Sequence, residues 1–206
     1  MHPNPVFHDA ETARNVAFAR LRGFGTLVVG QEGPPLVSHV PFALDAEGAV
    51  ADIHLVRSNP IARLSETVPA RIAVTGGDSY VSPDWYGVAD QVPTWNYIAV
   101  ELTGTLTRLP QDEMRAMLDR QSAWYEAQLA PKPAWTTDKM TPEVLERMMR
   151  QIVPIRFDVT GIDGTWKLGQ NKPDDVRARA ADEMAANGFG TEVAALARAM
   201  RDLDHR

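Results

Sequence analysis

Two histidines are the first residues of this sequence whose type and position could support ligand or metal chemistry. His39 and His54 both lie in apolar stretches rather than in polar tails. The nearest acid, Asp52, gives only an Asp-x-His pair, and no HExxH or HxH spacing occurs, so we predict no metal site. The alternative interpretation is a half-buried histidine whose ring nitrogens are satisfied by the backbone.

A second candidate is Arg57, which is followed directly by Ser58 and then by Asn59-Pro60. A capping side chain before a proline is a helix-start signal, so we predict a helix over 58–66. A guanidinium, a hydroxyl and the free amides of a helix start together suit a phosphate group. A surface ion pair is the alternative interpretation for Arg57.

Aromatic side chains gather between residues 80 and 97, and residues 77–93 are also rich in Gly, Pro, Asp and Ser, so we predict a binding loop at 77–93. Asp84, Thr94 and Asn96 are interleaved with them, and these groups are costly to bury without partners. Core packing is the common role of aromatics, but ring faces next to amide groups also suit a flat heteroaromatic ligand. The aromatic residues are Tyr80, Trp85, Tyr86, Trp95 and Tyr97.

Composition excludes several classes of function. The 206 residues include no cysteine, which removes thiolate metal sites, disulfides and cysteine nucleophiles. A net charge of −6 disfavours direct nucleic-acid binding. No GxGxxG, P-loop or GxSxG motif is present, and the longest apolar runs are too short to span a bilayer. The N-terminus carries no secretory signal, so we expect a cytoplasmic protein with no membrane segment.

The elements that must position these residues follow from hydrophobic periodicity and turn signals. Short loops between the first strands predict an antiparallel meander, and the whole pattern predicts an α+β fold, a β barrel or roll with peripheral helices. Asp163-Gly164 predicts a hairpin. We predict strands at 24–29, 36–44, 49–56, 70–76, 95–109, 152–161 and 165–169, and helices at 9–22, 58–66, 110–129, 141–149, 174–187 and 191–203.

Five segments give the sequence a family resemblance. In order, they are SHVPF at 38–42, HLVRSNP at 54–60, SYVSPDWY at 79–86, VPTWNYIAV at 92–100 and KLGQNK at 167–172. Together they resemble the PaiB-type FMN-binding negative transcriptional regulator family. The resemblance implies a split β-barrel of antiparallel strands with peripheral helices, similar to pyridoxamine-phosphate oxidases, with FMN held at a homodimer interface. It also implies a split-barrel FMN-binding domain at 1–172 and a helical extension at 173–206 packed on the same domain.

The resemblance also implies roles for individual residues. Arg57 and Ser58 match the phosphate contacts, and His54 and Asn59 would border the ribityl chain. The strand carrying Ser38, His39, Val40 and Pro41 would lie beside the flavin ring, and Pro93, Thr94, Trp95 and Asn96 along its edge. Lys167, Gln170 and Asn171 would come from the closing hairpin and reach the cofactor of the other subunit.

Three functions remain open from the sequence. The first is a flavin-dependent oxidoreductase, in which FMN carries the redox chemistry with a small-molecule electron donor or acceptor. The second is a PaiB-like transcriptional regulator without enzymatic activity, although the mixed charges of the two terminal helices favour a solvated surface over a DNA-reading one. The third is a haem-binding or haem-degrading split barrel that uses His39 or His54 as an axial ligand.

Overall fold

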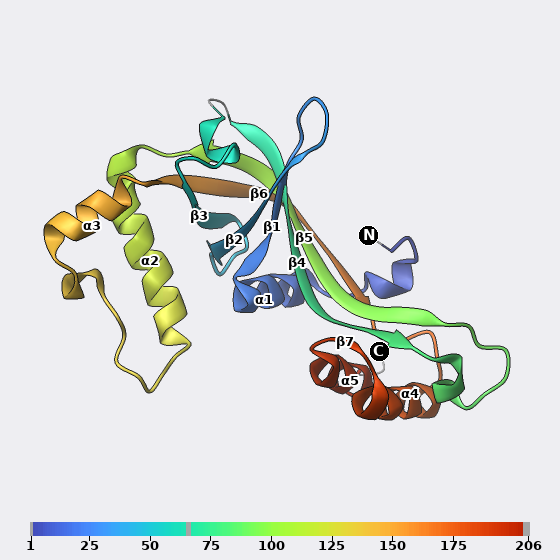
Figure 1. The fold of residues 1–206 in the computed structure, drawn as a ribbon. Coiled ribbons are helices and arrows are strands. Elements are labelled where there is room, and N and C mark those ends of the chain that lie inside the picture. Colours follow the sequence, from blue (N-terminus) through green and yellow to red (C-terminus); the bar gives the residue numbers. More distant parts are fainter. Residues whose placement is uncertain (1, 65–66, 204–206) are drawn as a thin grey trace. The chain divides into compact units, whose positions relative to one another are not determined.

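A computed structural model describes residues 2–64 and 67–203 of the chain (Figure 1). Its helices are α1 (Thr12–Arg22), α2 (Met114–Ala127), α3 (Pro142–Met149), α4 (Asp174–Asn187) and α5 (Val193–Arg201), with short 3-10 turns between elements. Its strands are β1 (Phe24–Val29), β2 (Leu36–Leu44), β3 (Val50–Val56), β4 (Val68–Val81), β5 (Thr94–Arg108), β6 (Ile152–Lys167) and β7 (Gly190–Thr191).

The chain divides into two compact units. One, the barrel unit, comprises Val16–Val74 and Glu101–Ile162. The other, the terminal unit, comprises the residues up to Asn15, Thr75–Val100 and the residues from Asp163 onward. The long strands β4, β5 and β6 contribute residues to both units. The domain boundary predicted between residues 172 and 173 stays a prediction.

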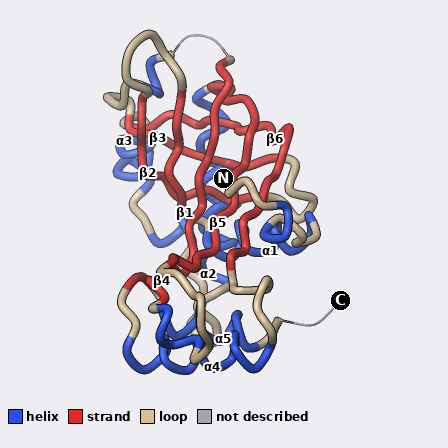
Figure 2. The backbone as a smooth tube through the Cα atoms, turned by 90° about the vertical axis from the view of Figure 1, so that its right-hand side faces the viewer, coloured by secondary structure: helices blue, strands red, loops and turns tan. Residues whose placement is uncertain are grey.

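The strands of the barrel unit form an antiparallel sheet that closes on itself (Figure 2). Their order is β1-β2-β3-β6-β5-β4, and β1 also pairs with β4, where Thr26 lies opposite Ala73. On its other side Thr26 lies opposite His39 of β2. Closure of this kind leaves no free edge in the ring of strands, and it confirms the predicted α+β barrel.

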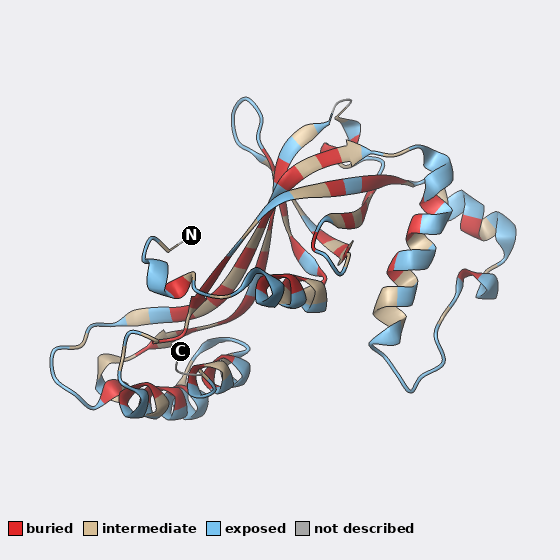
Figure 3. Ribbon diagram, turned by 180° about the vertical axis from the view of Figure 1, so that it is seen from behind, coloured by how far each residue is buried: buried red, intermediate tan, exposed pale blue. Residues whose placement is uncertain are grey.

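Alternation along the strands builds the barrel core (Figure 3). Val40, Phe42 and Leu44 of β2 are buried while the residues between them are only partly so. The same alternation runs through β3 and through β5, as their apolar and polar patterns predict. Residues of odd number in β2 and of even number in β3 therefore share the outer face of the barrel.

The terminal unit is organised around the α4 and α5 helices. Their facing side chains are apolar, and Ala180, Ala181, Met184, Leu196 and Met200 are all fully buried. The short strand β7 pairs with the end of β4, where Asp78 lies opposite Thr191. The helices at 174–187 and near 191–203 were thus predicted, whereas β7 was not.

Two predicted elements are wrong. Asp163-Gly164 forms no hairpin, because β6 runs without interruption through both residues. Gly164 serves a close approach instead: a Cβ there would lie 2.1 Å from Oδ1 of Asn15. The helix predicted over 58–66 is only the 3-10 turn Ile61–Arg63, and residues 65–66 lie outside the described residues.

A third difference concerns the predicted binding loop at 77–93. Strand β4 continues to Val81, so the loop begins only at Ser82 and includes the 3-10 turn Pro83–Tyr86. Within residues 2–64 and 67–203, no helix is long and apolar enough to cross a bilayer.

Candidate functional site

Arg57 follows the last residue of β3 and is fixed by carbonyl acceptors. Its backbone N–H donates to the carbonyl of Gln151 at 2.8 Å. Its Nε donates to the carbonyl of Arg150 at 3.0 Å, and its Nη2 to the carbonyl of Ile152 at 3.3 Å and to Oε1 of Gln111 at 2.7 Å. A guanidinium has five N–H donors; three are used, and the two on Nη1 have no acceptor among the described residues and can serve a ligand.

Gln111 orients this guanidinium and was not identified from the sequence. Its Nε2 donates to the carbonyl of Met149 at 2.9 Å. Because a carbonyl only accepts, this bond places Oε1 of Gln111 toward Arg57. No sequence signal could have found it, since Gln111 lies 54 residues from Arg57 in an ordinary helix-start segment.

The turn that carries Ser58 is braced by Asn59. Nδ2 of Asn59 donates to Oγ of Ser38 at 3.0 Å, and Oδ1 accepts from the backbone N–H of Ile61 at 2.9 Å. Ser58 is exposed between these anchors. Because the helix that follows has only three residues, its amides add little to a phosphate site, and Arg57 and Ser58 carry that prediction alone.

The β2 residues predicted to lie beside a flavin ring alternate between the two faces of the sheet. His39 and Pro41 are on the outer face, together with His54 of β3, which was predicted to border the ribityl chain. Ser38 and Val40 have the opposite parity, and Val40 is 1% exposed and belongs to the core, so its side chain cannot lie beside the ring as predicted. Nδ1 of the exposed His39 lies 3.2 Å from Oγ1 of Thr26. Contacts of these residues with a cofactor stay predictions.

A second group of predicted residues lies in the terminal unit. Nζ of Lys167 donates to Oγ1 of Thr94 at 2.6 Å, and burial lowers the pKa of this lysine. Trp95 is 44% exposed and makes edge contacts with the rings of Tyr80 and Phe189. Asn96 is 1% exposed and donates to the sulfur of Met200 at 3.4 Å.

The remaining predicted residues of this unit are Pro93, Gln170 and Asn171. Pro93 and Asn171 are exposed. Gln170 accepts from the N–H of Leu168 at 2.8 Å and donates to the carbonyls of Trp166 and Val6 at 2.6 and 3.2 Å. All of its amide atoms are engaged within the protein, which makes Gln170 a brace of this segment.

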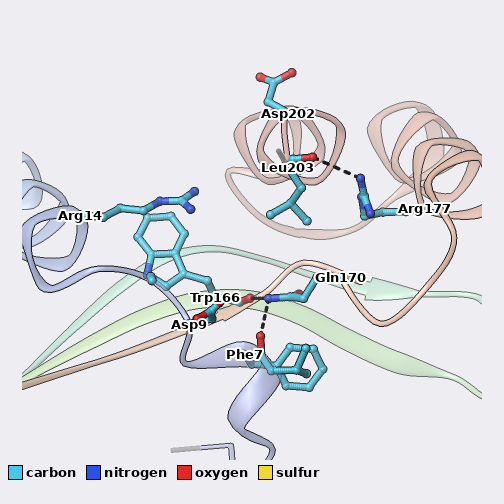
Figure 4. A pocket seen from close by; sticks show the side chains of 10 residues that line it. Phe7, Asp9, Arg14, Trp166, Gln170, Arg177, Asp202 and Leu203 are labelled. Atoms are coloured by element: carbon cyan, nitrogen blue, oxygen red, sulfur yellow. Dashed lines mark hydrogen bonds between the residues drawn. The ribbon is translucent and has the colours of Figure 1, made fainter. Parts of the chain in front are cut away.

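Gln170 also lines a polar cavity of about 420 Å³ in the terminal unit (Figure 4). Arg14 lies over the ring of Trp166, with its guanidinium carbon 4.0 Å from the ring centroid. Arg177 lines the same cavity and donates to the carbonyl of Leu203 at 3.5 Å. None of the residues predicted to contact phosphate lines this cavity.

The structure thus brings the predicted residues together in two groups. Among the described residues, no group of three or more His, Asp or Glu is arranged to hold a metal ion. The barrel unit holds Ser38, His39, Val40, Pro41, His54, Arg57, Ser58 and Asn59, and the terminal unit holds Pro93, Thr94, Trp95, Asn96, Lys167, Gln170 and Asn171.

Comparisons with known proteins agree with the resemblance seen in the sequence. Residues 1–161 match the family described as "Putative FMN-binding domain". The chain is also 31% identical over 158 residues to "Protease synthase and sporulation protein PAI 2" of Bacillus subtilis (strain 168), covering 75% of each protein.

Solved structures support the fold. The FAD and heme binding protein from Mycobacterium smegmatis is similar with a TM-score of 0.59 at 18% identity, over 90% of this chain and 82% of that chain. The flavocytochrome Anf3 from Azotobacter vinelandii is similar with a TM-score of 0.53 at 10% identity, over 82% of this chain and 73% of that chain. At these identities the likeness confirms the predicted split-barrel fold and says nothing about a ligand.

Proposed function

This chain belongs to the family of putative FMN-binding domains, and from that premise we propose that it holds FMN through Arg57 and Ser58 and acts as a flavin-dependent oxidoreductase. FMN is the cofactor that family membership assigns. The observation that carries the phosphate assignment is the state of Arg57, an exposed guanidinium fixed by three acceptors with two donors left over.

The donors present fit a phosphate. The two hydrogens of Nη1 can meet two oxygens or share one, and the exposed hydroxyl of Ser58 lies on the next residue. Because the acceptors that hold Arg57 are carbonyl and amide oxygens and not carboxylates, its positive charge is not neutralised locally. It is therefore available to a bound anion.

When bound, FMN supplies hydride transfer at its ring system, and the protein supplies binding and orientation. Arg57 and Ser58 would fix the phosphate end. His39 and Pro41 would lie along the cofactor on the outer face of the barrel, Thr94 would lie along the edge of the flavin ring, and Lys167 would reach the flavin of the second subunit. These roles rest on the match to the family's motifs.

The phosphate assignment is tested by titrating FMN into the full chain and following the quenching of flavin fluorescence. We expect Arg57→Ala to weaken FMN binding by about 30-fold, since a charge-assisted hydrogen bond contributes about 1.5–3 kcal/mol. Arg57→Lys keeps the positive charge but lacks the forked guanidinium, so its FMN affinity should lie between those of the wild-type protein and Arg57→Ala. Arg156→Ala removes an exposed arginine elsewhere in the barrel unit and is the matched control. Equal affinity in Arg57→Ala and the control would exclude this phosphate site.

The oxidoreductase step needs its own test. The FMN-loaded protein should lose its flavin absorbance under anaerobic conditions when NADH or NADPH is added, and regain it with oxygen. A regulator without enzymatic activity is the second candidate, supported by the similarity to PAI 2. It would be favoured if the flavin is retained but neither nucleotide reduces it.

We also propose a homodimer, because the resemblance implies one. The terminal unit exposes several large apolar side chains, which suits an interface: Val88, Val92, Trp95 and Phe189 are 47%, 73%, 44% and 61% exposed. Sedimentation equilibrium of the full chain tests this proposal, and a monomer at micromolar concentration would contradict it.

A further inference from the structure

A mostly apolar cleft in the barrel unit lies beside the braced Arg57. It has a volume of about 330 Å³, at the lower end of the range for small-molecule sites. Gln151 and Ile152 line it, and their carbonyls accept hydrogen bonds from Arg57. His54 of β3 and Leu118 and Ser122 of α2 line both this cleft and an adjacent hollow. We call it the His54 cleft.

A short hydrogen-bond chain fixes the tautomer of His54. Nε2 of Gln121 donates to the backbone carbonyl of Asp52 at 2.8 Å, which can only accept. Oε1 of Gln121 therefore faces Nδ1 of His54, 2.8 Å away, and Nδ1 must carry the proton. In the neutral ring this leaves Nε2 as an acceptor, and no described residue donates a hydrogen bond to it.

The other walls of the cleft determine what kind of molecule fits. Trp135, Leu145 and three methionines supply apolar and polarisable surface, and methionine adapts readily to aromatic ligands. Within the described part of the chain, no Asp, Glu, Lys or Arg lines the cleft, so a charged molecule would lose its hydration there without gaining an ion pair. Thr137 also lines it, but its hydroxyl is already engaged with Asp119 and Arg115.

We propose that the His54 cleft binds a small, uncharged aromatic molecule that donates a hydroxyl or N–H hydrogen bond to Nε2 of His54. We further infer that such molecules are the substrates of the flavin site. This second statement rests on the proposed function, whereas the binding itself does not.

Phenol is the probe and toluene the control, because the two have nearly the same shape and only phenol has a donor. Their binding to the full chain, with and without FMN, is followed by NMR of ¹³C-labelled methionine methyl groups. We expect phenol to bind about tenfold more tightly than toluene, with shifts at Met140 and Met149.

His54→Phe should remove the preference for phenol while toluene still binds, and His8→Phe, at a histidine outside the cleft, should leave the preference unchanged. Equal affinity for phenol and toluene in the wild-type protein, or no shift of the cleft methionines, would overturn the proposal even if His54→Phe fails to fold.

The FMN titration separates the two proposals. If FMN binds and phenol does not, the cleft is not a ligand site and the proposed function stands. If phenol binds and FMN does not, the cleft stands and its molecules are not flavin substrates.

Discussion

Arg57 in the barrel unit and Arg177 in the terminal unit make the same kind of contact, but the two contacts have different roles. Each donates to carbonyl oxygens at the C-terminal end of a helix: Arg57 to Arg150 just after α3, and Arg177 to Met200 of α5 at 2.8 Å. A cation there is also favourable against the helix dipole.

The two arginines differ in burial and in what remains of their donors. Arg177 is 4% exposed, and its third branch, Nη1, pairs with Asp174 at 2.9 Å. Arg57 is exposed and leaves Nη1 without an acceptor among the residues described. A buried guanidinium with every branch engaged holds two helices together, whereas an exposed one with a free branch is prepared for a ligand.

The largest expected effect is a difference in the free energy of unfolding between variants of the two arginines. Arg177→Met should lower the free energy of unfolding by about 2–3 kcal/mol, because it leaves the buried carbonyl of Met200 without its donor. Arg57→Met should lower it by less than about 1 kcal/mol, since water replaces the lost donor at an exposed position. Urea unfolding of both variants measures the difference, and equal losses would break the comparison.

A smaller effect is expected at the turn that presents Ser58. Asn59→Ala removes both the bond to Ser38 and the cap on Ile61, and should cost about 1 kcal/mol of stability. Ser38→Ala removes only the first bond and is the matched control. If both variants lose the same stability, the cap on Ile61 contributes nothing to the turn.

The positioning role of Gln111 can be measured through FMN affinity. Gln111→Ala should weaken FMN binding about fivefold without changing the unfolding midpoint, because Arg57 keeps its charge but loses one of its anchors. Gln111→Glu should weaken binding at least as much, since a carboxylate beside Arg57 neutralises the charge that the phosphate needs. Tighter binding by Gln111→Glu would contradict this role.

The smallest expected effect is a pH dependence at Lys167 in the terminal unit. Burial lowers the pKa of Lys167 below its ordinary value of 10.5, because the charged form loses hydration. Lys167 therefore loses its proton, and its attraction for an anion, at a lower pH than an exposed lysine. FMN affinity should fall about threefold as the pH rises toward 10.5 in the wild-type protein and not in Lys167→Arg, which stays charged. Parallel titration curves would remove Lys167 from the site.

The fold of the barrel unit could be predicted well because its information is local. The strands at 24–29, 36–44 and 49–56 are β-rich runs separated by the turn clusters 30–35 and 45–48, and the structure confirms them to within one residue. The hairpin predicted at Asp163-Gly164 was wrong for a physical reason. The glycine is needed because Asn15, nearly 150 positions earlier in the chain, lies too close for a side chain at this position.

The same contrast between local and long-range information applies to the residues of the candidate site. Arg57 and Ser58 are candidates because they are adjacent in sequence and precede a helix-start signal, and His39 and His54 are candidates because they lie in apolar stretches. Gln111 and Gln121 were not identified as orienting residues, because each acts through a backbone carbonyl that only the folded chain places beside it. A glutamine on a helix carries no local sign of which side of its amide will face a functional group.

The pairing of β4 with β7 has a consequence for how the chain is made. Ser79 donates to the carbonyl of Phe189, 110 residues later, at 2.9 Å. A ribosome adds roughly 5–20 residues per second, so the end of β4 waits roughly 5–20 s for its last partner. During that interval Tyr80 lacks the ring of Phe189 that stacks on it in the finished protein, and the strand edge beside it is open. The end of β4 therefore closes late in synthesis, and it is exposed to mispairing until Phe189 has been made.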